Sequence, residues 1–126
     1  MPFKYERDDA RLRVVITFQG PFQMCEAFAA MDRHQIEDAW SYGVLYDLRQ
    51  QTASPSLGEL RQLMSTDASD TTGDRGPVAF VVIDADKYRI ACTYGAMVQS
   101  KIKIEVFREM DEAHLWLTAH TAGKDR

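Results

Sequence analysis

The chain has 126 residues, of which 45% are hydrophobic and 27% charged, so it is long enough to bury the core of one domain and too apolar to be a disordered chain. Its 15 Lys and Arg against 19 Asp and Glu give a net charge of −4 without a basic cluster, which argues against binding to nucleic acid through phosphates. The segment from Met1 to Arg11 is charged, which argues against a secretory signal. No run of about 20 apolar residues is present, which argues against a membrane span, so we expect a cytoplasmic protein.

The first predicted elements are a β-hairpin and a helix. Residues 3–7 and 11–18 flank a short polar turn, and the second segment alternates apolar and polar side chains, as a half-buried strand does. Gly20-Pro21 is expected to end this strand. From Phe22 to about Trp40, apolar residues recur at helical spacing, which predicts a helix docked on the sheet. Its expected buried residues are Met24, Cys25, Phe28, Met31 and Ile36.

A second helix is expected to begin in a serine-rich segment. Ser56-Leu57-Gly58-Glu59 fits a capping box, in which the serine oxygen accepts an early helix N–H and the glutamate reaches back. An alternative start has Ser54 as the N-cap and Pro55 in the first turn, where its missing N–H costs nothing. The expected buried stripe of this helix is Leu57, Leu60 and Met64.

Three further strands are predicted. Gly43 to Arg49 is the first of them. The unbroken apolar run from Val78 to Ile83 predicts a strand buried on both faces, because successive strand residues point to opposite sides. Ile102 to Phe107 carries Lys103 and Glu105 on one face, which is typical of an edge strand.

Helices are predicted from Lys87 to about Gln99 and from Met110 to His120. The resulting order, β-β-α-β-α-β-α-β-α, predicts an α/β fold with a mostly parallel five-stranded sheet led by one antiparallel hairpin strand. We expect a single domain with its core between about residues 3 and 119 and a polar tail at 120–126. The last helix is expected to bury Ala113, Trp116 and Leu117.

Three stretches carry a resemblance to a known family. They are Val44–Arg49 before a serine-rich helix start, the strand Val78–Asp84, and the ending Val106-Phe107-Arg108-Glu109-Met110-Asp111-Glu112-Ala113-His114-Leu115-Trp116-Leu117. Over roughly residues 3–119 the chain resembles the SpoIIAA-like bacterial family. That family is related in fold to STAS domains and more distantly to CRAL-TRIO lipid-binding domains. The resemblance implies a non-catalytic regulatory or protein-interaction module.

The resemblance also implies a modification site. In anti-sigma antagonists an Asp-Ser-x-Gly turn at a helix start carries the phosphorylated serine. Here Ser54 matches that serine, whereas Ala53 replaces the aspartate and Ser56 the first glycine. A phosphate or other anion at Ser54 or Ser56 would face helix N–H groups and could meet Arg49. The alternative is that both serines only cap the helix.

Polar residues follow the predicted strands at their carboxyl ends, where open α/β sheets tend to bind ligands. Asp47 and Asp84 are two carboxylates without a third partner, a pattern more typical of capped loops or Arg pairs than of a metal site. We therefore expect no metal and no cofactor. The candidate ligand rim is Asp47, Thr52, Asp84 and Arg108.

No catalytic group is indicated, and we expect a protein that is not an enzyme. His34 is expected on the polar side of the first helix and His114 on an exposed face of the last. Cys25 and Cys92 are expected to be buried as small apolar groups, without a basic neighbour that would activate the thiol.

The helix from Lys87 to Gln99 carries two apolar stripes, more than one sheet face should cover. The second stripe, formed by Ile90, Tyr94 and Met97, could contact a second subunit, line a pocket for an apolar ligand, or pack between the sheet and neighbouring helices. The favoured hypothesis is a homodimeric regulatory module that meets a protein partner. The alternative is a carrier or sensor of a small apolar molecule or lipid in a pocket near this helix.

Overall fold

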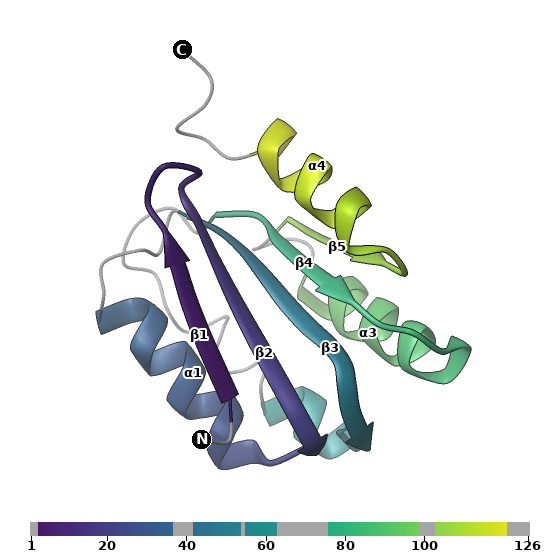
Figure 1. The fold of residues 1–126 in the computed structure, drawn as a ribbon. Helices are drawn as coiled ribbons and strands as arrows, with labels where there is room; N and C mark the ends of the chain where they lie inside the picture. Colours follow the sequence, from purple (N-terminus) through teal and green to yellow (C-terminus); the bar gives the residue numbers. More distant parts are fainter. Residues whose placement is uncertain (1–2, 37–41, 54, 63–75, 99–102, 121–126) are drawn as a thin grey trace.

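The computed structural model describes residues 3–36, 42–53, 55–62, 76–98 and 103–120. Within these residues, five strands form one sheet in the order β1-β2-β3-β4-β5 (Figure 1). The first two strands are antiparallel and the other neighbours are parallel, which confirms the predicted α/β fold with its hairpin strand. The strands are β1 (Phe3–Asp8), β2 (Arg13–Pro21), β3 (Gly43–Ala53), β4 (Val78–Val81) and β5 (Ile104–Phe107).

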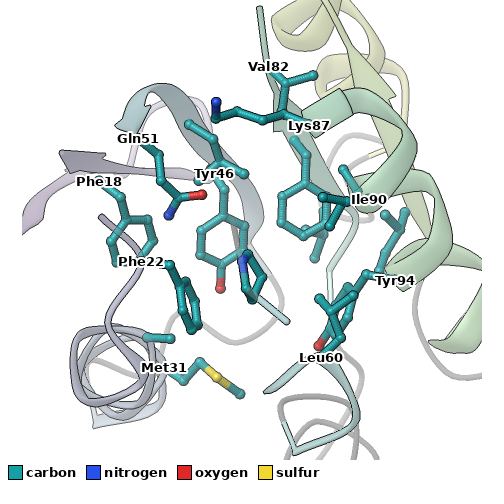
Figure 2. A pocket seen from close by; sticks show the side chains of 17 residues that line it. Phe18, Phe22, Met31, Tyr46, Gln51, Leu60, Val82, Lys87, Ile90 and Tyr94 are labelled. Atoms are coloured by element: carbon teal, nitrogen blue, oxygen red, sulfur yellow. The ribbon is translucent and has the colours of Figure 1, made fainter. Parts of the chain in front are cut away.

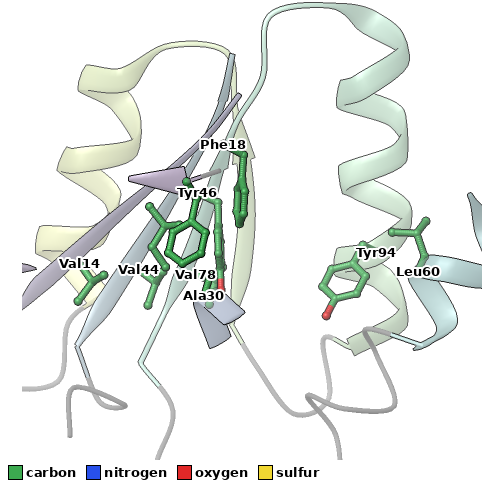
Figure 3. Packing of buried hydrophobic residues seen from close by; sticks show 10 residues of the cluster. Val14, Phe18, Ala30, Val44, Tyr46, Leu60, Val78 and Tyr94 are labelled. Carbon is green, nitrogen blue, oxygen red and sulfur yellow. The ribbon is translucent and has the colours of Figure 1, made fainter. Parts of the chain in front are cut away.

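Helices alternate with the parallel strands and cover both faces of the sheet. They are α1 (Met24–Ile36), α3 (Ala85–Val98) and α4 (Met110–His120), with a further helical segment at 57–62. Because β2 to β5 advance across the sheet in one direction, right-handed crossovers place α1, the segment 57–62 and α3 on the same face. In Figure 3 the strands lie between α3 on one side and α4 on the other. Among the described residues, no helix is long and apolar enough to cross a membrane.

The strand β4 lies inside the sheet, between β3 and β5, as its continuous apolar sequence predicts. Val78, Ala79 and Val81 are at most 2% exposed although they point to different faces. The strand ends at Val81, two residues before the predicted end, and Ile83 is 55% exposed. The interior position of this segment is therefore confirmed, and its burial stops where the chain turns into α3.

Two apolar clusters fill the space on either side of the sheet. On the face of α1 and α3, the cluster includes Val14, Val44, Tyr46, Val78 and Tyr94 (Figure 3). On the α4 face, a smaller cluster joins Leu45, Ala79, Val81, Ala113 and Leu117. The expected burial of Ala113 and Leu117 is confirmed, and Trp116 is half-buried.

The helical segment at 57–62 begins with the predicted capping box. The Ser56 N–H donates to Glu59 Oε1 at 2.8 Å, and the Glu59 N–H donates to Ser56 Oγ at 3.2 Å. Leu60 is buried, as expected, but Leu57 is 53% exposed, so the predicted stripe is wrong at that position. Ser54, the alternative cap, and Met64 lie outside the described residues.

The buried face of α1 differs from the predicted one. Among the described side chains of this helix, the buried ones are Ala27, Ala30 and His34, spaced three and four residues apart, and Cys25 is exposed. The prediction that Cys25 is buried and that His34 lies on the polar side is therefore wrong. Met24, Phe28 and Met31 are half-buried, and the side chain of Ile36 is not described.

The two stripes predicted on α3 merge into one inward face. Ala91 and Tyr94 are buried, Ile90 is half-buried, and Met97 has no described side chain. Cys92 is exposed, which corrects its expected burial, and Tyr88 is 37% exposed. The helix therefore turns Ile90 and Tyr94 toward the sheet.

Candidate ligand-binding pocket

An apolar pocket of about 110 Å³ lies between the sheet and the helices on the α1 and α3 face (Figure 2). The strands supply its floor through Phe18, Tyr46, Leu48, Val78 and Phe80, together with Val82 directly after β4. Its walls come from the helices and the segments before them, through Phe22, Ala27, Met31, Leu60, Ile90, Ala91 and Tyr94. The pocket is therefore built from residues that the fold brings together from across the whole chain.

A series of aromatic rings crosses the pocket because neighbouring strands present the same face. Tyr46 and Phe80 are direct partners in the register of β3 and β4, and their rings stack with centroids 5.3 Å apart. Phe18 stacks on Tyr46 at 6.2 Å, and Tyr94 of α3 meets Phe80 edge-on at 6.1 Å. Offset and edge-to-face rings at these spacings attract each other, so the aromatic floor and wall are held in place.

One end of the pocket is polar. Gln51 near the end of β3 and Lys87 in the first turn of α3 both line it, and Figure 2 shows them at the end near Val82, away from Met31 and Leu60. Gln51 is 8% exposed, so most of its side chain is shielded from bulk solvent. This end coincides with the carboxyl ends of β3 and β4, where open α/β sheets tend to bind ligands.

Lys87 is held by the residue that caps its helix. The Asp84 carboxylate accepts the Lys87 backbone N–H at 2.8 Å and the Lys87 ammonium at 3.0 Å. These bonds, the backbone one first, hold the pKa of Asp84 below its ordinary value. The Lys87 side chain is 18% exposed, so its stem packs along the pocket while its charged end stays near solvent.

The other residues proposed for a ligand rim do not gather around the pocket. Asp47 is 4% exposed and forms a bidentate ion pair with Arg49. Arg49 Nε donates to Asp47 Oδ1 and Arg49 Nη2 donates to Asp47 Oδ2, each at 2.9 Å. Burial would raise the pKa of Asp47, but the hydrogen bonds and charge of Arg49 outweigh this and lower it. Thr52 is exposed on β3, and Arg108 donates to the Ile83 carbonyl at 2.9 Å.

The predicted anion site is described only in part. Ser56 is exposed and serves the capping box, and Ser54 lies outside the described residues. The Arg49 guanidinium, which was expected to meet an anion at these serines, is engaged with Asp47. Within the described residues no group of three or more His, Cys, Asp or Glu side chains could hold a metal ion.

A second polar cluster, which the sequence did not indicate, lies under α4. Arg13 of β2 is 2% exposed and donates to His114 Nδ1 at 2.8 Å and to Thr118 Oγ1 at 2.9 Å. Because a guanidinium has only donors, His114 Nδ1 must accept, so the ring is neutral with its proton on Nε2. His114 was expected on an exposed face, and this prediction is wrong.

This cluster predicts a pH dependence of stability. Burial, followed by the charges of Arg13 and Arg11, lowers the pKa of His114 below its ordinary value of 6.5. A histidine with a lowered folded-state pKa contributes stability above its unfolded pKa and loses it as the pH falls through the folded pKa. Urea unfolding should therefore show stability decreasing as the pH is lowered from 6.5. In His114→Gln, whose amide oxygen still accepts from Arg13, this decrease should be smaller, and an equal decrease in both proteins would contradict the assignment.

No protein-family model matches the chain, and no curated protein matches it significantly.

Proposed function

We propose that this protein is a non-catalytic binding domain that holds a small apolar molecule in the pocket between the sheet and helices α1 and α3, as a carrier or a sensor. The observation that carries the proposal is the apolar space of about 110 Å³ on this face. Protein interiors are packed as densely as organic crystals, with few voids larger than one water molecule. A dry apolar cavity of about 150 Å³ binds benzene, so the space here suits a molecule about the size of one ring.

The placement of the α3 residues supports this proposal. Ile90 and Tyr94 were expected to contact a second subunit, to line an apolar pocket, or to pack between the sheet and neighbouring helices. Both line the pocket, and Tyr94 is only 7% exposed. Little of the Tyr94 ring is therefore exposed for contact with a second subunit, whereas a molecule inside the pocket would contact the ring directly.

Membership in the SpoIIAA-like group, with its STAS relatives, is a second proposal. It is supported by the order of elements and by the mixed five-stranded sheet. In this proposal the domain meets a protein partner or forms a homodimer, and Ser54 or Ser56 is its candidate modification site. A ligand in the pocket and a partner outside it are compatible, because a sensor needs both.

Titration of the purified protein with toluene, followed by amide NMR spectra, tests the binding proposal. Toluene is apolar and close in size to the pocket, so we expect shifts for backbone amides of residues around it, such as Tyr46, Ile90 and Tyr94. Amides of Ala113 and Leu117 lie across the sheet and serve as the internal control. Shifts of equal size on both faces, or none at millimolar toluene, would reject the pocket as a binding site.

A further inference from the structure

The side-chain amide of Gln51 is a polar group in a mostly apolar pocket. The residue is 8% exposed and lies in a pocket that is otherwise mostly apolar. In Figure 2 its side chain points into the pocket beside the aromatic floor. The amide atoms are not among the fully buried side-chain atoms that lack a partner, so the amide can bond to water or to a molecule in the pocket. A molecule in the pocket therefore meets a polar side chain at this end.

Lys87 adds a charged donor at the same end of the pocket. Its ammonium has three N–H groups, and Asp84 Oδ2 takes one of them at 3.0 Å. A ligand oxygen placed between Gln51 and Lys87 would therefore accept from the amide NH2 and from the ammonium. The Lys87 ammonium has donors only and so selects an acceptor, and the Gln51 amide, which can donate or accept, is able to donate to the same oxygen.

The charges around this end favour an anionic acceptor. Lys87 and Arg108 are positive and Asp84 is negative, and Arg108 acts on the Asp84 carboxylate through its charge. The amino terminus of α3 adds its partial positive charge, since Ala85 begins the helix here. In the same turn Asp86 pairs with Arg89 at 2.6 Å and Asp84 with Lys87 at 3.0 Å, so Arg108 and the helix terminus are what add positive charge beyond these two ion pairs.

We infer that the ligand is a small monocarboxylate, with an apolar body of about one ring in the pocket and its carboxylate between Gln51 and Lys87. The inference rests on the proposed function, because it specifies the chemistry of the molecule that the pocket holds. The apolar body contacts Tyr46, Ile90 and Tyr94. The carboxylate lies at the carboxyl ends of β3 and β4, where it stays close to water.

Comparison of three probes by calorimetric titration tests this inference. Benzoate carries a ring and a carboxylate, benzyl alcohol a ring and a neutral hydroxyl, and toluene a ring alone. We expect benzoate to bind roughly tenfold more tightly than toluene, because charge-assisted hydrogen bonds are the stronger ones. Benzyl alcohol should fall between them.

Variants at the polar end separate the two parts of the site. Lys87→Met keeps the apolar stem and should weaken benzoate binding by about tenfold, a larger change than in toluene binding. Gln51→Leu should weaken benzoate binding and leave toluene binding equal or tighter. Asp84→Asn keeps a capping side chain and removes a negative charge, so benzoate binding should tighten. Lys4→Met, on β1 with its side chain 70% exposed, is the matched control and should change neither.

The outcomes distinguish the carboxylate inference from the proposed binding of an apolar molecule, on which it rests. Equal affinities for benzoate and toluene in the wild type, or benzoate binding unaffected by Lys87→Met and Gln51→Leu, would overturn the carboxylate inference and leave the apolar pocket standing. Binding of none of the three probes would overturn both.

Discussion

Replacement of Leu117 by alanine should lower the free energy of unfolding by about 2–5 kcal/mol, as large-to-small changes in a packed core do. Leu117 is fully buried in the cluster that joins α4 to β3 and β4. The loss combines the transfer free energy of the removed carbons with the cavity they leave. Urea unfolding followed by circular dichroism measures it.

Leu115 provides the matched control on the same helix. It is 72% exposed, so Leu115→Ala should change the free energy of unfolding by no more than about 0.5 kcal/mol. Equal losses for the two substitutions would contradict the placement of α4 across the sheet, and with it the layered arrangement of helices on both faces.

Filling the pocket should abolish ligand binding without unfolding the protein. Ala91 is buried on α3 and lines the pocket, so the ring of Ala91→Phe would occupy the space meant for the ligand. We expect no measurable toluene or benzoate binding by calorimetry. Cavity-filling substitutions commonly add about 0.5–2 kcal/mol of stability, and the thermal midpoint should therefore be unchanged or higher.

Ala96 offers the corresponding control, because it lies on the same helix and is exposed. Ala96→Phe introduces the same ring outside the pocket and should leave binding as in the wild type. If Ala91→Phe still binds toluene with wild-type affinity while folded, the ligand does not occupy this pocket.

Local patterns in the sequence were sufficient to predict the fold. The continuous apolar run of β4 requires cover on both faces, and the alternation of strands and helices leads to a mostly parallel sheet. The capping box at Ser56 and Glu59 depends on neighbouring residues alone, and it forms as predicted. The limits of α4 were also predicted correctly, from Met110 to His120.

The polar groups of the sites were harder to predict because their environment is set by distant segments. Gln51 was not expected to be buried, since β3 was predicted to end at Arg49 and instead runs to Ala53. A register shift between β2 and β3 accompanies this longer strand. Arg13 occupies a position on β2 that would face solvent, and it is buried because α4 lies across it. Its partner on α4, His114, is 101 residues away in the sequence.

The most direct test of the central claim is a crystal structure of the wild-type protein under xenon pressure. Xenon enters apolar cavities without needing any polar contact. We predict a xenon atom between Tyr46, Ile90 and Tyr94, on the α1 and α3 face of the sheet. Side chains collapsed together at that place, with no xenon between them, would contradict the claim that this fold holds a pocket for an apolar molecule.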